Sequence, residues 1–138
     1  MLHDIGKLKI PDSIPWKPAK LTEDEWKIMQ RHAEYGFEFL SNIGFLKDAA
    51  EIVYSHHEKY DGTGYPRGLQ GENIPFGARV FAIVDAVDAM IYKRPYNAPV
   101  SFREAAAEVK RCVGTQFDPS LVETTLAYLD DHVPSQLK

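Results

Sequence analysis

Four of the five histidines in this 138-residue chain fall in its first half, at His3, His32, His56 and His57. The last two are adjacent, in the segment YSHHEKYDGTGYP. Such a pair alone is more often a half-exposed polar pair at a helix end, and a lone histidine in an amphipathic helix is usually solvated or hydrogen-bonded. Four imidazoles concentrated in a histidine-poor chain instead favour a shared role, and neutral imidazole is a common metal ligand.

Two carboxylates accompany these imidazoles. Asp4 directly follows His3, and a carboxylate beside an imidazole can share a metal ion or bridge two ions. Asp85 lies in the most apolar stretch, FGARVFAIVDAVDAMIY, where a cation would offset the cost of burying a carboxylate. Asp88, one helical turn further on, competes with Asp85 for this role. Nitrogen and oxygen donors suit iron, manganese or zinc, and a pair of such ions makes hydroxide available for attack on a phosphodiester.

Lys7 and the DGTGYP segment extend this inventory. Lys7 and Asp4 lie on nearly one face if this part of the chain is helical. The glycines of DGTGYP permit tight turning. From DGTG alone an ordinary surface turn is the favoured interpretation, and it is the neighbouring histidines that favour a functional one. Glu58 is a candidate for orienting His57, and Asp61 for hydrogen bonding within the turn.

Composition places the chain among ordinary globular proteins, with 44% hydrophobic and 26% charged residues. The formal net charge of -4 provides no general basic surface, which argues against duplex nucleic acid as a partner. The single cysteine, Cys112, excludes an internal disulfide and a cysteine-ligated zinc site. No apolar run approaches the ~20 residues that span a bilayer, and the N-terminus lacks a signal-peptide pattern. We therefore expect a cytoplasmic protein with no membrane segment in this chain.

Helix signals dominate, and no alternating strand pattern competes with them. Thr22 and Glu25 form a capping box that predicts a helix to about residue 40. One face of this helix is expected to carry Trp26, Met29, Ala33, Gly36 and Phe37. Other helices are predicted at about 46–58, 75–92, 101–113 and from Asp118 to about 129. The proline-rich segment 9–22 is expected to be an irregular link. These patterns predict an all-α protein with a single domain over residues 1–138.

Three motifs stand in a recognisable order over residues 2–96: HDIGK, HHEKYDGTGYP and DAVDAMIYKRPY. In sequence and spacing the chain resembles the HD-GYP family of HD-superfamily metal-dependent phosphohydrolases. Its members are typically phosphodiesterases of the bacterial second messenger cyclic di-GMP. The resemblance implies an HD-superfamily helical bundle of about five to six helices. It also implies hydrolysis of cyclic di-GMP through a metal-bridged hydroxide.

The resemblance implies two divalent metal ions as cofactors, with iron or manganese favoured and zinc as a further option. The implied ligands are imidazoles and carboxylates: His3, Asp4, Asp85, His32, His56 and His57. His3, Asp4 and Asp85 would hold the first ion. His32, His56 and His57 would hold the second. Asp4 would bridge both ions and count as a catalytic residue.

Four residues would contact the substrate if the resemblance holds. Lys7 would bind the scissile phosphate and favour charge development there, which also makes it catalytic. Arg94 and Tyr96 would hold the other phosphate or a base, and Tyr65 in the GYP turn would line the ligand pocket. The alternative for Arg94 is a charge partner for the dipole at a helix C-terminus.

The chain departs from the family pattern at its beginning. Family members carry helices upstream of the HD dipeptide that deliver a further histidine or glutamate ligand, whereas two residues precede His3 here. We therefore expect a domain that is partial at its N-terminus and lacks the first helices of the bundle. The first ion should bind more weakly than the second and turnover should be slow. Uncovered apolar surface would favour a homodimer.

Two other functions remain open at this point. One is a catalytically impaired HD-GYP module that binds cyclic di-GMP or a partner protein such as a diguanylate cyclase domain. The other is a nucleotide monophosphatase of the wider HD superfamily, which would share His3 and Asp4 but leave the GYP segment unexplained. Metal content together with turnover distinguishes the enzyme from the binding module.

Overall fold

A computed structural model describes residues 2–92 and 98–137, and all of its longer elements over these ranges are helices. The α-helices are α1 (Glu23–Gln30), α2 (His32–Ser41), α3 (Lys47–Ser55), α4 (Phe76–Ile91), α5 (Phe102–Arg111) and α6 (Val122–His132). Four 3-10 helices accompany them, η1 (Leu2–Lys9), η2 (Gly44–Leu46), η3 (Gly71–Asn73) and η4 (Ser135–Leu137). The predicted all-α class is confirmed. Within the described ranges, no helix has the length and apolar character needed to cross a bilayer.

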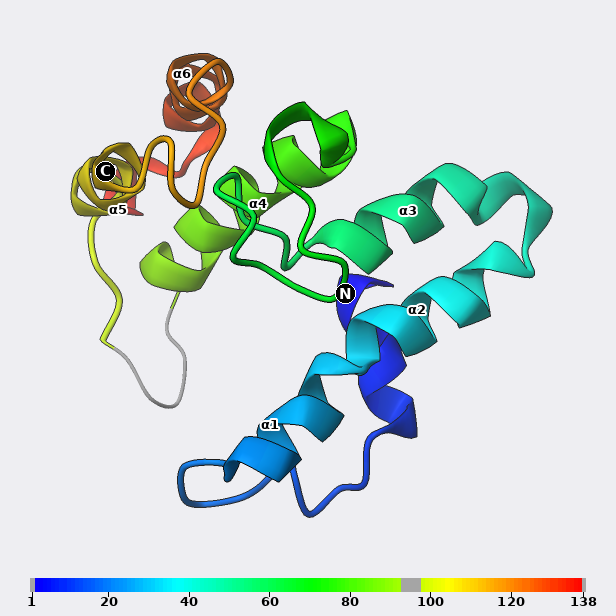
Figure 1. Cartoon of the computed structure of the whole chain (residues 1–138). Helices are drawn as coiled ribbons and strands as arrows, with labels where there is room; N and C mark the ends of the chain where they lie inside the picture. Colours follow the sequence, from blue (N-terminus) through cyan, green and yellow to red (C-terminus); the bar gives the residue numbers. More distant parts are fainter. Residues whose placement is uncertain (1, 93–97, 138) are drawn as a thin grey trace.

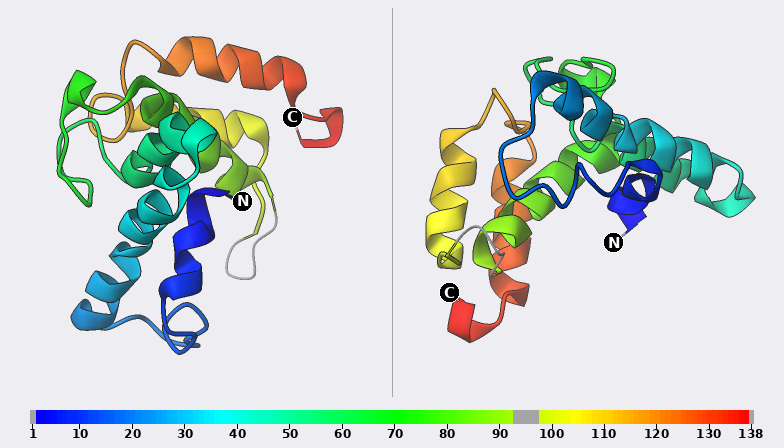
Figure 2. Two further views of the ribbon diagram at one scale, coloured as in Figure 1. Left: turned by 90° about the vertical axis from the view of Figure 1, so that its right-hand side faces the viewer. Right: turned by 90° about the horizontal axis from the view of Figure 1, so that it is seen from below.

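The helices form two packed groups that meet at α4 (Figure 1). In the first, α2 and α3 make an antiparallel hairpin, and η1 lies alongside α2 (Figures 1 and 2). In the second, α5 and α6 pack on α4 around buried residues such as Ile83, Val87 and Val109. Leu40, Ala50 and Val53 form a smaller core inside the hairpin. The start of η1, the start of α2 and the end of α3 thus come close to α4.

The helix predicted from Thr22 to about residue 40 is interrupted. The capping box at its start is present, because the Glu25 N–H donates to Thr22 Oγ1 and the Thr22 N–H donates to Glu25 Oε2. However, α1 ends at Gln30 and α2 begins at His32. Between them the Arg31 N–H donates to the Ile28 carbonyl, three residues back, which is the tighter 3-10 pattern. The single continuous helix was therefore a wrong prediction.

Two further sequence predictions need correction. The last helix begins at Val122 and not at Asp118. The buried Asp118 carboxylate instead accepts hydrogen bonds from Ser120 and forms an ion pair of 2.5 Å with Arg79 of α4. Trp26, predicted to share one face with Ala33, is 48% exposed, whereas Ala33 is buried. At Asp118 the tertiary contact with Arg79 outweighs the local helix signal.

A glycine contact brings η1 against α2. A Cβ atom added to Gly6 would lie 1.9 Å from the His32 carbonyl oxygen and 2.6 Å from the Gly36 nitrogen. Only hydrogen at this position allows the two backbones to approach so closely. The contact matters for the site, because η1 carries His3, Asp4 and Lys7.

We expect the Gly6→Ala substitution to separate η1 from α2. The added methyl group meets backbone atoms, which cannot rotate away, so unfolding should become easier by about 1–3 kcal/mol. Gly44→Ala is a matched control, because a Cβ there meets nothing within 4 Å. Urea unfolding curves of the two variants check the prediction. Equal midpoints for Gly6→Ala and Gly44→Ala would contradict it.

Candidate metal centre

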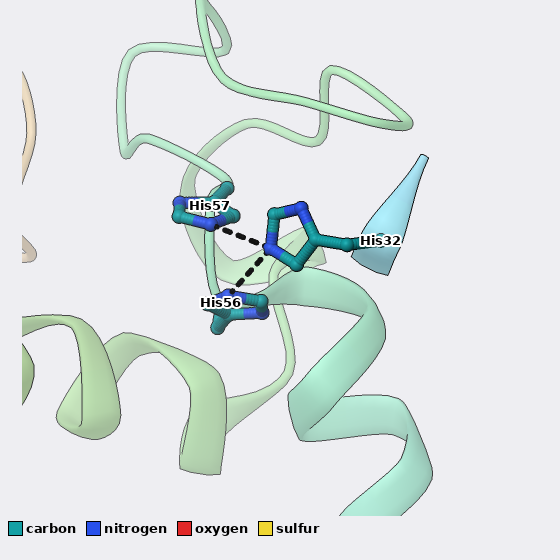
Figure 3. Close-up of side chains that lie close together, drawn as sticks. All are labelled: His32, His56 and His57. Atoms are coloured by element: carbon teal, nitrogen blue, oxygen red, sulfur yellow. Dashed lines mark hydrogen bonds between the residues drawn. The ribbon is translucent and has the colours of Figure 1, made fainter. Parts of the chain in front are cut away.

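Three histidines lie together at the ends of two helices (Figure 3). His32 is the first residue of α2, and His56 and His57 directly follow α3. The Nε2 atom of His32 is 3.1 Å from Nε2 of His57 and 3.4 Å from Nε2 of His56. One ligand atom from each ring lies within 4.8 Å of the others. This spacing is compatible with three ligands of a single metal ion.

The hydrogen bonds of two of these rings define their tautomers. Nδ1 of His32 lies 2.6 Å from the Met29 carbonyl oxygen, and Nδ1 of His56 lies 2.6 Å from the Val53 carbonyl oxygen. A carbonyl oxygen only accepts, so each Nδ1 carries the proton and each neutral ring has its lone pair on Nε2. Lone pairs facing one another repel, and a cation between them removes that repulsion. The donor set therefore fits a metal ion of the kind that imidazoles bind.

Burial keeps this cluster neutral. Desolvation lowers the pKa of His56 to about 4 and that of His57 to about 3, with neighbouring imidazoles adding to the effect at both. Desolvation also lowers the pKa of His32. Near neutral pH the Nε2 lone pairs of His32 and His56 are consequently available to a metal without loss of a bound proton, and His57 is neutral beside them.

The same shifts predict how the stability of the metal-free protein depends on pH. The reference pKa of histidine is 6.5, so below this pH the unfolded chain binds more protons than the folded chain. Its free energy of unfolding should therefore fall as the pH is lowered from about 6.5 toward about 4.5. Urea midpoints measured after chelation check this, with His56→Asn expected to flatten the dependence and His132→Ala to leave it unchanged. A midpoint independent of pH in this window would contradict the prediction.

Asp4 lies between the cluster and a second group of candidate ligands. Its Oδ1 is 3.9 Å from Nε2 of His32, and its Oδ2 is 3.6 Å from Nε2 of His3 and 2.9 Å from Nζ of Lys7. Burial acts to raise the pKa of Asp4, but the Lys7 ammonium and the neighbouring imidazoles outweigh it and the pKa is lowered. The ionised carboxylate thus presents one oxygen to each side, as a bridging ligand must.

Asp85 and His3 complete this second group. Asp85, on α4, has its Oδ1 3.8 Å from Nε2 of His3. Phe81, one turn earlier on the same helix, has its ring centroid 5.1 Å from that of His3 and 6.3 Å from that of His56. Phe81 was not among the predicted site residues, although its spacing of four residues from Asp85 places both on one face of α4. Its ring packs against members of both groups.

The GYP turn folds back over His57. The Tyr65 N–H donates to the His57 carbonyl over 3.2 Å, and the Tyr65 and His57 rings stack with centroids 4.7 Å apart. A Cβ at Gly64 would lie 2.3 Å from the Lys59 nitrogen and 2.5 Å from the Glu58 Cα, so this return requires glycine. The expectation that the glycines permit tight turning beside the histidines agrees with this geometry.

Glu58 has a different part from the one suggested for it. The contacts of its buried carboxylate are with the turn, because Oε1 accepts from the Arg67 N–H at 2.8 Å and Oε2 from the Leu69 N–H at 3.0 Å. It therefore anchors the chain beyond GYP, and His57 is oriented by its stacking on Tyr65. Asp61 accepts from the backbone and hydroxyl of Thr63, as expected for hydrogen bonding within the turn.

The structure brings most of the predicted site residues into one region. The contacts described above link residues from several elements: His3, Asp4 and Lys7 of η1, His32 of α2, His56 and His57 after α3, Tyr65, and Asp85 of α4. Arg94 and Tyr96 lie outside the described residues.

Comparison with known proteins identifies relatives with named activities. The family model described as HD domain matches residues 1–121. A 3'3'-cGAMP-specific phosphodiesterase 2 of Vibrio cholerae is 46% identical over 96% of this chain and 26% of its own length. A cyclic di-GMP phosphodiesterase of Thermotoga maritima is 45% identical over 91% of this chain and 34% of its own length. The chain thus spans between about a quarter and a third of these relatives.

A solved structure gives the same fold. The crystal structure of a cyclic GMP-AMP specific phosphodiesterase of Vibrio cholerae superposes with a TM-score of 0.65 over 94% of this chain and 36% of that chain. The sequences are 20% identical, so the likeness concerns the arrangement of the helices.

Proposed function

The chain belongs to the HD domain family and is of the HD-GYP type, and from this premise we propose that it is a metal-dependent phosphodiesterase of cyclic dinucleotides, with cyclic di-GMP as substrate. The observation that carries the proposal is the convergence of three buried imidazoles beside the Asp4 and Lys7 pair. Neutral nitrogen ligands, a carboxylate placed to bridge two ions and the partly exposed Lys7 ammonium suit a phosphate ester. The relatives named for cyclic di-GMP and 3'3'-cGAMP support the substrate class.

Six residues would hold two divalent ions in this proposal. His32, His56 and His57 would bind one ion, His3 and Asp85 the other, and Asp4 would bridge them. Iron and manganese suit these nitrogen and oxygen donors, as does zinc. When bound, such ions polarise phosphoryl oxygens and lower the pKa of water, so that hydrolysis proceeds near neutral pH.

Lys7 and Tyr65 would act directly on the phosphate. The Lys7 side chain is 42% exposed while its Nζ pairs with Asp4, so the ammonium is oriented but can still be reached by a ligand. It would offset the negative charge that develops on the phosphoryl oxygens. Burial, together with the Asp4 charge, raises the pKa of Tyr65 to about 12. Tyr65 therefore keeps its proton and can donate a hydrogen bond.

A second candidate function is a module that binds a cyclic dinucleotide with little turnover. The observation in its favour is the asymmetry of the two groups of ligands. Over residues 2–92 and 98–137, the three-histidine group alone meets the spacing for a metal site. The His3 group offers one imidazole and two carboxylates with separations of 3.6 and 3.8 Å. One ion bound at the histidines would permit binding of phosphate without efficient hydrolysis.

A substrate panel tests the proposal. The purified chain, loaded with manganese or iron, is incubated with cyclic di-GMP, with 3'3'-cGAMP and with a nucleoside monophosphate, and the products are separated by chromatography. We expect water to add across a phosphodiester bond of cyclic di-GMP, giving a phosphomonoester and a free hydroxyl group, while the monophosphate is unchanged. Release of phosphate from the monophosphate at a higher rate than hydrolysis of cyclic di-GMP would contradict the proposal. Binding of cyclic di-GMP without product would favour the module.

A further inference from the structure

Trp26 is an aromatic side chain at the edge of the site that the proposed reaction does not use. We propose that its indole is a nucleobase-binding surface, on which one base of the cyclic dinucleotide stacks while a phosphate lies at the histidine cluster. This inference rests on the proposed function and adds to it a residue that contacts the substrate. Nucleobases commonly stack on aromatic side chains, because every base has a flat π-face.

Trp26 is the outermost of three neighbouring rings, after those of His57 and Tyr65. The His57 ring stacks on Tyr65 with centroids 4.7 Å apart and an interplanar angle of 22°. The Tyr65 ring in turn lies 6.3 Å from the Trp26 ring at 77°. Two rings nearly at right angles form a corner, in which a flat base can stack on one ring and touch the edge of the other. Trp26 is therefore one ring away from a candidate metal ligand.

The exposure of Trp26 is suited to this role. Trp26 is 48% exposed, on a helix with no buried residue. An indole half open to water and half fixed by a neighbouring ring leaves apolar surface for a ligand to cover. Trp16, which is 80% exposed, lies outside this chain of rings and gives an internal comparison.

The backbone of Trp26 is held at the start of α1. Its N–H donates to the Thr22 carbonyl over 2.8 Å, inside the capping box formed with Glu25. Glu25 is also paired with Lys17 over 2.6 Å. The helix end that carries the indole is thus fixed from two sides. Because the backbone that carries the indole is held before the ligand arrives, stacking costs less conformational entropy.

Steady-state kinetics with cyclic di-GMP tests the proposal. Trp26→Ala should raise KM about tenfold, equivalent to about 1.4 kcal/mol, with kcat changed less than about threefold. Trp26→Phe keeps an aromatic face and should stay within about threefold of the wild-type KM. Trp16→Ala should match the wild type. A KM for Trp26→Ala equal to that of Trp16→Ala would overturn the proposal.

A second measurement works even if Trp26→Ala fails to fold. The chain has two tryptophans, so Trp16→Phe leaves Trp26 as the sole indole. Saturating cyclic di-GMP should quench its fluorescence, whereas ribose 5-phosphate, which has no base, should not. Absence of quenching by the bound dinucleotide would overturn the proposal. If the metal-loaded protein turned over no cyclic dinucleotide, the proposed function would fail, and quenching would still decide whether Trp26 stacks on a base.

Discussion

Replacing His32 by alanine is expected to remove the metal from the histidine cluster and with it the activity. His32 is the central residue of the cluster. Its Nε2 lies 3.1 Å from Nε2 of His57, 3.4 Å from Nε2 of His56 and 3.9 Å from Oδ1 of Asp4. Loss of a partner outside the ligand shell costs about 10- to 100-fold in metal affinity. Loss of the central ligand should therefore weaken binding by more than about 100-fold.

The control for this substitution is His132→Ala. His132 is an exposed histidine at the end of α6, hydrogen-bonded to the Tyr128 carbonyl. Both variants lose one imidazole, so a difference between them reports the position and not the residue type. Metal per chain, measured by atomic emission after dialysis, should drop in His32→Ala and stay at the wild-type value in His132→Ala. Equal metal content in the two variants would refute the assignment of the cluster.

Replacing Lys7 by methionine is expected to lower kcat by about 10²- to 10³-fold while the metals stay bound. Methionine is an unbranched side chain only one atom shorter than lysine, and it removes the charge that would face the phosphoryl oxygens. Lys7 also pairs with Asp4, so a purely structural role predicts a different result. If the lysine serves only to hold Asp4, its loss should lower the metal content together with the rate.

Lys9→Met separates the site from a general effect of charge. Lys9 ends η1 and pairs with Glu38 over 3.0 Å on the surface. Exposed pairs of this kind contribute at most about 1 kcal/mol to stability, and activity should be nearly unchanged. The rates of both variants on cyclic di-GMP, with metal content determined for each, decide the matter. If Lys7→Met were as fast as Lys9→Met, Lys7 would have no role in the reaction.

Local signals in the sequence predict where several of the helices lie. The capping box at Thr22 marks the start of α1, where the structure has it. The helix predicted at about 101–113 is α5, which the structure opens with a capping box at Ser101. The apolar segment from residue 76 to 91 forms α4, the helix shared by both packed groups. Such signals depend on hydrogen bonds and side chains within one turn of helix, and so they can be read without tertiary contacts.

Much of the candidate site could also be predicted, because it rests on residue types. Four imidazoles in a histidine-poor chain indicated a shared role before their distances were known. The contacts between segments could not be predicted in the same way. The Gly6 approach to the His32 carbonyl, the Glu58 anchor of the GYP turn and the Tyr65–Trp26 corner each join residues distant in sequence. Backbone proximity of this kind leaves no periodic pattern.

The interruption between α1 and α2 at Arg31 could not be predicted from the sequence either. Nothing in the residue types from Ile28 to His32 marks the end of a helix, since glycine and proline are absent there. The tighter turn places His32 at the start of a new helix, where it meets the residues that follow α3. Tertiary packing at the cluster outweighs the small preference for continuing the helix.

In the proposed function, hydrolysis of a cyclic dinucleotide depends on metal held by this site. The most direct measurement is the initial rate of cyclic di-GMP hydrolysis by the chain, first stripped by a chelator and then titrated with manganese or iron, with bound metal determined at each point. We predict a rate near zero in the stripped protein that rises with bound metal and is absent throughout in His32→Ala. Hydrolysis undiminished by chelation, or a fully loaded protein that consumes no cyclic dinucleotide, would contradict this metal dependence.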